Sequence, residues 1–160
     1  MKVLKRIVFL AIAVFSLTLS SSCSSDSSDG DSVGSAEGFI KYKYNGVMYT
    51  FEDPALITSL NTNIMGNSGI DDTYKKISLW TPLNITTGSH PIVYDLSNIE
   101  TTYQATFSFM PSVNNRNATS GTINITVNNS ERIEGTFNFS GTNGGETFTV
   151  TDGSFRVEKY

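Results

Sequence analysis

The chain has 160 residues and a net charge of −4 at neutral pH, with one cysteine and one histidine. This acidic balance argues against a nucleic-acid partner, because contacts to phosphates require clustered Lys and Arg side chains. A single cysteine excludes an internal disulfide, and one cysteine with one histidine is too few for a His/Cys metal site. We therefore expect no metal, no cofactor and no nucleic acid.

Residues 1–22 have the pattern of a secretory signal peptide. Lys2, Lys5 and Arg6 give a positively charged start, and an apolar run of 13 residues follows over positions 7–19. A membrane-spanning helix needs about 20 apolar residues. The run is therefore predicted to be a secretion signal and not a permanent span.

The segment from Leu19 to Cys23 resembles the lipobox of Bacteroidota lipoproteins, with small serines before the cysteine and Ser20 where the usual pattern has an aliphatic residue. The resemblance implies that Cys23 becomes the acylated mature N-terminus and anchors the protein in the outer membrane, on its periplasmic or cell-surface face. Two or three acyl chains anchor a protein durably, whereas one chain does so only marginally. The alternative is an ordinary cleaved signal, which removes Cys23 or leaves it as a free thiol.

Residues 23–37 are predicted to be a tether. Positions 24–36 read SSDSSDGDSVGSA, which contains too little apolar surface to order itself. A flexible coil of about 14 residues reaches roughly 20 Å, enough to hold a domain away from a membrane. Acidic residues directly after the cysteine also resemble the surface-export signals of Bacteroidota lipoproteins.

Residues 38–160 show strand signals from their start. Ile40, Tyr42 and Tyr44 alternate with lysines, which places the apolar set on one face of a sheet. Asn45-Gly46 follows, the preferred pair for a type I′ turn, and the alternation then resumes as far as Phe51. Later strands are expected over 55–65, 73–81, 91–96, 101–110, 122–127, 133–139, 148–150 and 155–157.

The connections follow from turn residues and polar composition. Residues 84–89 and 128–131 are predicted turns, and the Asn-rich segment 112–120 is a predicted loop. Asp152-Gly153 is predicted to be a second type I′ pair. Because the last strands are consecutive and their connections are short, we expect an antiparallel meander at the C-terminus.

These patterns predict an all-β domain over 38–160. No stretch keeps a 3.6-residue period over three helical turns. Eight to ten short strands favour an antiparallel β-sandwich, and a small barrel is the alternative. The run from Ser120 to Val157, with the hairpin from Asn45 to Phe51, resembles the DUF6252-like lipoproteins of Bacteroidota. The resemblance implies a β-sandwich protein of the cell envelope and supplies no catalytic residues.

Catalytic patterns are weak in this chain. His90 stands in Gly-Ser-His-Pro, and no motif places a serine and a carboxylate beside it, so we interpret it as a turn or strand-start residue. The adjacent pairs Glu52-Asp53 and Asp71-Asp72 lie in predicted turns. Neighbours on a strand point to opposite faces, so these pairs are interpreted as solvated charges and not as a glycosidase pair.

Aromatic side chains are the remaining candidates for a binding site. Trp80 alternates with Ile77 and Leu79, so it faces away from the core if those two face inward. An outward Trp80 could stack on a sugar ring, and Tyr74, Tyr94 and Tyr103 have the same potential. The alternative is that the strand is covered on both faces, since large aromatic side chains are usually mostly buried.

Three functional hypotheses follow. The first is a non-enzymatic outer-membrane lipoprotein whose β-sandwich serves binding or envelope structure, with the membrane and an envelope protein or glycan as partners. The second is a carbohydrate-binding accessory lipoprotein of a glycan-uptake system. The third is a small secreted hydrolase, which the sequence favours least.

Overall fold

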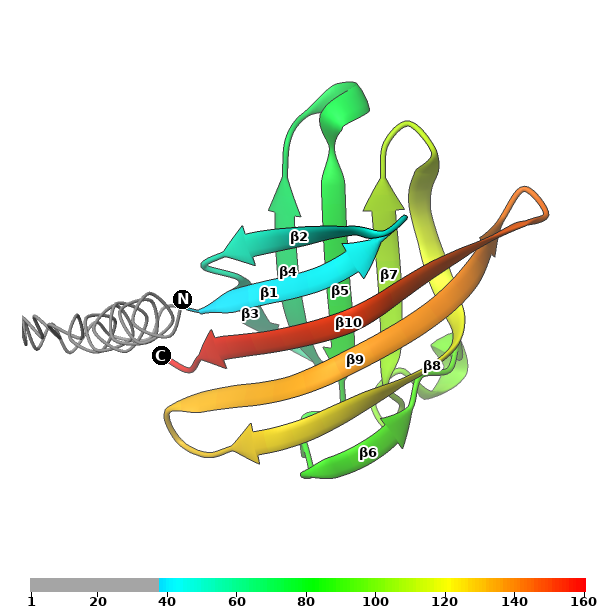
Figure 1. The fold of residues 1–160 in the computed structure, drawn as a ribbon. Coiled ribbons are helices and arrows are strands. Elements are labelled where there is room, and N and C mark those ends of the chain that lie inside the picture. The colour runs from blue at the N-terminus through cyan, green and yellow to red at the C-terminus, as the bar shows by residue number, and fades with distance from the viewer. Residues whose placement is uncertain (1–37) are drawn as a thin grey trace, which may run out of the picture. The chain divides into compact units, whose positions relative to one another are not determined.

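The computed structural model describes residues 38–160, and the predicted signal peptide, Cys23 and tether lie outside the described residues. This part of the chain is built from strands and two short 3-10 helices (Figure 1). The helices are η1, Asp71–Thr73, and η2, Leu96–Asn98. The strands are β1 Phe39–Tyr44, β2 Val47–Glu52, β3 Ala55–Thr58, β4 Thr62–Ser68, β5 Lys75–Thr81, β6 Gly88–Pro91, β7 Gln104–Phe109, β8 Val113–Asn128, β9 Arg132–Asn143 and β10 Glu146–Glu158.

The strands form one continuous antiparallel sheet that curls into two layers. The order is β2-β1-β10-β9-β8-β7-β5-β4-β3, and β6 pairs with β8 beside this path. The first part of β8 pairs with β7, and its longer second part pairs with β9. Strand β8 therefore passes from the back layer into the front layer. A strand that changes layers in this way makes the corner of an orthogonal packing.

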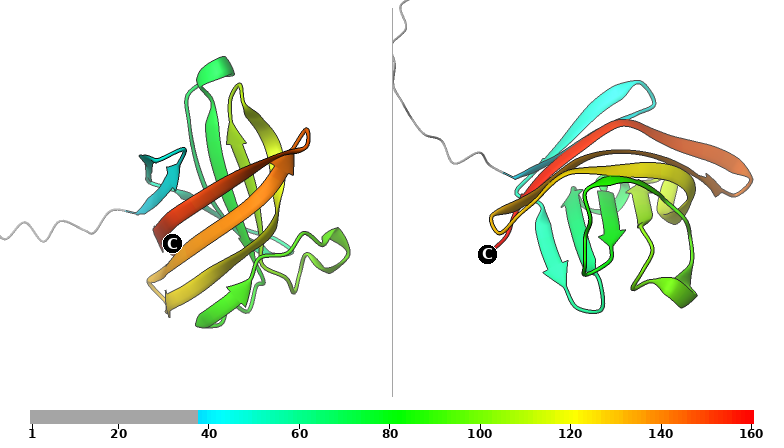
Figure 2. Two further views of the ribbon diagram at one scale, coloured as in Figure 1. Left: turned by 45° about the vertical axis from the view of Figure 1, so that its right-hand side comes forward. Right: turned by 90° about the horizontal axis from the view of Figure 1, so that it is seen from below.

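The two layers cross at a steep angle, with β1, β10 and β9 in front of β4, β5 and β7 (Figure 1). Seen from below in Figure 2, the front layer arches over the back one. The consecutive pairs β8–β9 and β9–β10 make the predicted C-terminal meander. The predicted all-β antiparallel sandwich is thus confirmed, with its layers joined through β8.

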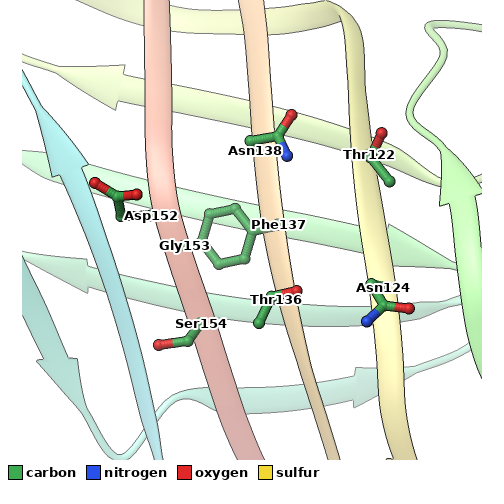
Figure 3. A pocket seen from close by; sticks show the side chains of 8 residues that line it. All are labelled: Thr122, Asn124, Thr136, Phe137, Asn138, Asp152, Gly153 and Ser154. Carbon is green, nitrogen blue, oxygen red and sulfur yellow. The ribbon is translucent and has the colours of Figure 1, made fainter.

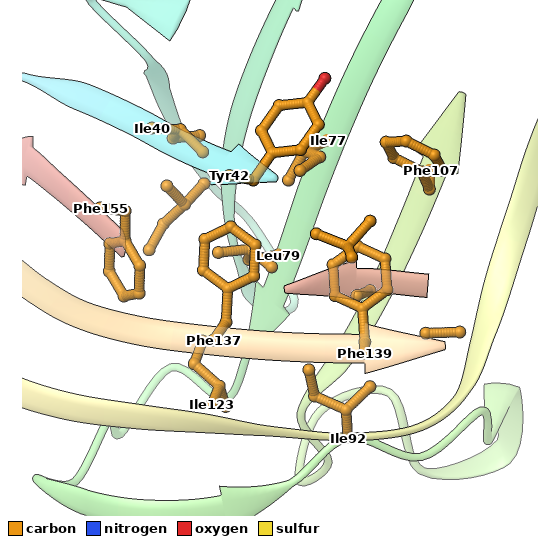
Figure 4. Close-up of a cluster of buried hydrophobic side chains, with 14 of the residues drawn as sticks. Ile40, Tyr42, Ile77, Leu79, Ile92, Phe107, Ile123, Phe137, Phe139 and Phe155 are labelled. Carbon is orange, nitrogen blue, oxygen red and sulfur yellow. The ribbon is translucent and has the colours of Figure 1, made fainter. Parts of the chain in front are cut away.

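The core lies between the two layers and is rich in aromatic rings. Phe107 of the back layer contacts the rings of Tyr42, Phe139 and Phe148 of the front layer. Figure 4 shows side chains from both layers meeting in this cluster. Within the described residues, this cluster extends from Ile40 near the start of β1 to Val157 near the end of β10.

The first predicted hairpin is confirmed in its turn as well as its strands. Ile40, Tyr42 and Tyr44 are buried on one face of β1. Asn45 and Gly46 both have positive φ, at 49° and 78°, as a type I′ turn requires. Strands β1 and β2 pair in register on either side of this turn.

The prediction of a second type I′ turn at Asp152-Gly153 is wrong, because these two residues lie inside β10. Val150 pairs with Phe139 and Gly153 pairs with Phe137, so β10 carries one extra residue at this point. This is a β-bulge. A Cβ on Gly153 would come within 2.5 Å of the Phe137 ring. The glycine is therefore needed for close packing between strands, not for reversing the chain.

Three other predicted elements differ from the structure. Segment 55–65 is two strands, β3 and β4, because a turn at 59–61 contains no Gly or Pro to mark it. Segment 112–120 is not a loop but the start of β8, whose exposed polar side chains gave it the composition of a loop. The strand expected over 91–96 is displaced to β6, and Leu96 belongs to η2.

Candidate functional site

One hollow of the described domain lies where three connections meet at one end of the back layer. We name it the end groove; its volume is about 530 Å³. Its walls come from the β3–β4 turn, the β5–β6 loop, β6 and the β6–β7 loop. The lining residues are Leu60, Pro82, Leu83, Asn84, Thr86, His90, Glu100, Thr101 and Tyr103. Connections at strand ends are where binding residues most often lie.

Two stacked rings form part of the lining of the end groove. His90 and Tyr103 lie with ring centroids 4.1 Å apart and an angle of 7° between their planes. His90 belongs to β6, where it pairs with Ile123 of β8. Tyr103 directly precedes β7 and is buried. The stack therefore connects the front layer to the back layer.

The hydrogen bonds of His90 determine which of its nitrogens carries a proton. Nε2 lies 2.9 Å from the main-chain oxygen of Thr86 and 3.4 Å from Thr86 Oγ1. A carbonyl oxygen can only accept, so Nε2 carries a hydrogen and donates it to Thr86. A general base needs a lone pair facing the nucleophile. The nitrogen that faces the Thr86 hydroxyl has no lone pair for this role.

The β5–β6 loop, residues 82–87, is held from both layers. The main-chain N–H of Thr86 donates to the hydroxyl of Tyr103 over 3.4 Å. Asn128, at the end of β8, donates its side-chain N–H to the carbonyl oxygen of Ile85 over 2.7 Å. With the His90 contact, these bonds fix the course of a loop that forms one side of the end groove.

The β6–β7 loop, residues 92–103, is a compact Ω-shaped connection. Its ends lie together, because the N–H of Val93 donates to the oxygen of Tyr103 over 3.0 Å. The buried Gln104 donates its side-chain N–H to the oxygen of Asp95 over 2.7 Å and to the hydroxyl of Thr102 over 2.8 Å. These bonds fix the loop that presents Glu100 and Thr101 to the end groove.

Asp95 organises the 3-10 helix within that loop. Its carboxylate accepts from the side chain of Asn98 over 2.7 Å and from the N–H of Ser97 over 2.9 Å. These two hydrogen bonds, the Asn98 one first, hold the pKa of the Asp95 carboxyl below its usual value. The carboxylate thus serves as the N-cap of η2.

The four predicted stacking residues lie in different places. Tyr103 lies under His90 in the end groove, and the exposed Tyr94 belongs to the β6–β7 loop. Tyr74 is half-buried just before β5. Within residues 38–160, none of these rings pairs with another of the four. His90, the partner that Tyr103 does have, is 13 positions away in the sequence, and no local pattern indicates that contact.

Trp80 lies on the face of β5 opposite Ile77 and Leu79 and is half-buried, but Ser78 on the same face is fully buried, so the strand is covered on both faces. Ile77 and Leu79 are fully buried on the inner face of β5. Trp80 pairs with Asn63 and Gln104, which share its outer face. Gln104 holds the β6–β7 loop against this face, so the loop lies beside the indole.

A second hollow, of about 410 Å³, opens on the outer face of the front layer, and we name it the front-face hollow. Figure 3 shows polar side chains of β8, β9 and β10 around the ring of Phe137, next to the bulge in β10. Asp152 at this bulge forms an ion pair with Lys43 over 3.1 Å. The polar lining residues are Thr122, Asn124, Thr136, Asn138, Asp152 and Ser154.

Within residues 38–160, no group of three His, Cys, Asp or Glu side chains is placed to hold a metal ion. The same part of the chain contains no helix that is both long and apolar enough to cross a membrane.

The fold and its hollows define a class: an antiparallel two-layer β protein with ligand-sized depressions. Comparisons with protein-family models, curated proteins and solved structures find no match to this chain. The resemblance to the DUF6252-like lipoproteins therefore stays a prediction.

Proposed function

We propose that this protein is an outer-membrane lipoprotein, anchored through an acylated Cys23, whose β-sandwich is a non-enzymatic binding module. The end groove carries the binding part of the proposal. Its volume of about 530 Å³ falls within the roughly 300–1,000 Å³ typical of ligand sites. Leu60, Pro82 and Leu83 give it apolar walls, and Asn84 and Glu100 add polar groups that can orient a ligand.

The hydrogen bonding of the end groove favours binding over catalysis. The His90 ring uses its Nε2 proton to hold the main chain of Thr86. The Tyr103 hydroxyl accepts from the same residue. His90 Nε2 and the Tyr103 hydroxyl therefore both support the wall of the groove, and a rigid wall is what a preorganised binding site needs.

The anchor is tested by metabolic labelling with an alkyne-bearing palmitate in a lipoprotein-processing bacterial host. We expect the wild-type protein to take up the label and to fractionate with the outer membrane. A Cys23→Ala variant should take up none. Mass spectrometry that finds an unmodified Cys23 thiol in the purified native protein would contradict the anchoring proposal.

The binding site is tested by screening residues 38–160 against glycans and envelope proteins. A ligand of the end groove should lose at least tenfold in affinity in Asn84→Trp, whose indole fills the groove. Asn84 is exposed and makes no side-chain hydrogen bond within the described domain, so folding should persist. The matched control is Thr149→Trp, at an exposed position of β10 that lines none of the hollows. An equal loss of affinity in both variants would contradict the proposal that the ligand binds in the end groove.

The front-face hollow favours carbohydrate binding as a second candidate function. Asn124, Asn138 and Thr136 make no side-chain hydrogen bonds within residues 38–160, so their amides and hydroxyl remain free to bind the hydroxyl groups of a sugar. A glycan array separates the candidates. Glycan binding at this face should be lost in an Asn124→Ala, Asn138→Ala double variant and retained in Asn84→Trp. Glycan stacking on Trp80 predicts loss in Trp80→Ala instead.

A further inference from the structure

A third hollow lies next to the end groove, where the edge of the back layer faces the β8–β9 turn of the front layer. We name it the seam cavity; its volume is about 300 Å³. Leu56, Leu83, Ile85 and Ile133 supply its apolar walls. Burial of a hydrocarbon against walls of this kind contributes roughly 25 cal/mol per Å² of apolar surface. The seam cavity is therefore suited to an apolar group.

The seam cavity and the end groove share one side chain. Leu83 lines both hollows and is 51% exposed. The loop that carries Leu83 presents Ile85 to the seam cavity and Asn84 to the end groove. An exposed leucine side chain changes rotamer on the ps–ns timescale. A single extended ligand that occupied both hollows would pass over Leu83.

One cation at the seam cavity has no anionic partner in the described domain. Lys159 lines the cavity, and its Nζ donates to Asn128 Oδ1 over 2.6 Å and to the oxygen of Asn129 over 2.7 Å. Both acceptors are neutral, and no carboxylate of residues 38–160 forms an ion pair with this ammonium. An ammonium has three donors, so one remains for a ligand. A charge beside apolar walls attracts an anion more strongly than it does in open water.

Charge also determines the orientation of a ligand that fills both hollows. Glu100 places a carboxylate in the end groove, which repels an anionic head there. Lys159 provides the opposite charge in the seam cavity. We infer that the joined hollows bind a single-chain amphiphile, with its anionic head at Lys159 and its hydrocarbon chain running over Leu83 toward the end groove. This inference rests on the proposed binding function and gives the ligand class.

The head site is connected to the dividing loop by hydrogen bonds. Asn128 accepts from Lys159 and donates to the oxygen of Ile85. Lys159 therefore lies two hydrogen bonds from the loop that separates the hollows.

The test is calorimetric titration of residues 38–160 with laurate, monododecyl phosphate and dodecanol, each below its aggregation concentration. Laurate represents a fatty-acid carboxylate, and monododecyl phosphate represents a lipid phosphate. We expect saturable 1:1 binding of at least one of the two anions, about tenfold tighter than that of the neutral alcohol. Equal affinities for all three, or no binding by either anion, would overturn the inference without any variant being made.

Two variants locate the ligand. Lys159→Met keeps the aliphatic stem and should lower anion affinity about tenfold, to the level of dodecanol, while dodecanol affinity stays unchanged. Leu83→Trp should weaken the anions and the alcohol alike. Lys41→Met is the charge-matched control, since Lys41 lies over the Phe39 ring on β1, away from both hollows. A thermal melt of each variant verifies folding.

The outcomes distinguish this inference from the function on which it rests. The glycan and envelope screen could find a ligand whose binding is lost in Asn84→Trp but unchanged in Lys159→Met. That result would support the proposed binding function and overturn the inference that the ligand is an anionic amphiphile. Anion binding that is unchanged in Lys159→Met would also overturn the amphiphile inference. Anion binding that falls in Lys159→Met and in Leu83→Trp but not in Lys41→Met supports the amphiphile.

Discussion

At the scale of single residues, Tyr42 carries a polar group that the core does not satisfy. The side chain is fully buried, and its hydroxyl has no hydrogen-bond partner. In Figure 4 the ring lies among the aliphatic and aromatic side chains of the core. Burial, with a smaller contribution from Tyr49, raises the pKa of the Tyr42 phenol above its usual value of about 10.

Removing this hydroxyl should stabilise the protein. Tyr42→Phe keeps the ring packing and removes a desolvated donor, so we expect a gain of about 1 kcal/mol in the free energy of unfolding at pH 7. Urea unfolding of the two proteins measures this difference. A loss of 1 kcal/mol or more would mean that the hydroxyl has a partner in solution.

The same phenol makes stability depend on alkaline pH. Because its pKa is higher in the folded state, the unfolded chain loses the proton first as the pH rises above about 10. The Tyr42 contribution is therefore complete below pH 10 and falls above it, at up to about 1.4 kcal/mol per pH unit. The stability gap between Tyr42→Phe and wild type should widen between pH 9 and pH 11. A constant gap would contradict the raised pKa.

At the scale of elements, the bulge in β10 depends on a residue without a side chain. The position of a Cβ on Gly153 is 2.5 Å from the Phe137 ring and also 2.5 Å from the Phe137 carbonyl oxygen. The ring could move, but the carbonyl belongs to the β9–β10 ladder. We expect Gly153→Ala to destabilise the fold by about 1–3 kcal/mol, as overpacking does. Thermal unfolding measures this cost.

The control for this prediction is the glycine of an open turn. A Cβ on Gly144 would have no atom within 4 Å, but the φ of this residue is +63°, so alanine there carries backbone strain alone. Gly144→Ala should therefore cost about 1 kcal/mol. If Gly153→Ala costs no more than this, the packing explanation for the bulge is wrong.

The bulge also shows how far local sequence specifies the elements of this fold. Asn45-Gly46 and Asp152-Gly153 have the same turn chemistry, and only the first reverses the chain. The second is overridden by tertiary pairing, since its neighbours already have partners in β1 and β9. Segment 112–120 is a similar case, because pairing with β7 and β9 makes a strand from a polar sequence. The alternation of apolar and polar residues predicted the strands well where one face of the strand is buried.

The candidate site could be predicted less well than the strands, for a physical reason. Alternation along β5 separates Trp80 from Ile77 and Leu79, but it does not reveal that Asn63 and Gln104, which pair with Trp80, are themselves buried. The end groove depends on contacts between distant segments, such as His90 with Tyr103 and Asn128 with Ile85. Those contacts arise from the curl of the sheet and the course of its loops, which have no period in the sequence.

At the scale of the whole molecule, the sheet links the start and the end of the domain. Strand β1 pairs with β10, and β8 continues from one layer into the other. Neither layer has a core of its own, because the buried side chains lie between the two. A fold with one shared core and a continuous hydrogen-bonded sheet should unfold in a single cooperative transition.

Trp80 allows this cooperativity to be measured, since the only tryptophan of the chain lies in the back layer. Its fluorescence should follow urea unfolding with the same midpoint as the far-UV circular dichroism of all strands. Ile40→Val in β1 and Ile64→Val in β4 remove one buried methylene from opposite layers. Each should lower the free energy of unfolding by about 1 kcal/mol, whether it is measured by fluorescence or by circular dichroism. The substitution Ile57→Val at an exposed position should change the free energy of unfolding by no more than about 0.5 kcal/mol in either measurement. If Ile40→Val shifts the dichroism but leaves the Trp80 transition unmoved, the two layers unfold separately and the shared core does not couple them.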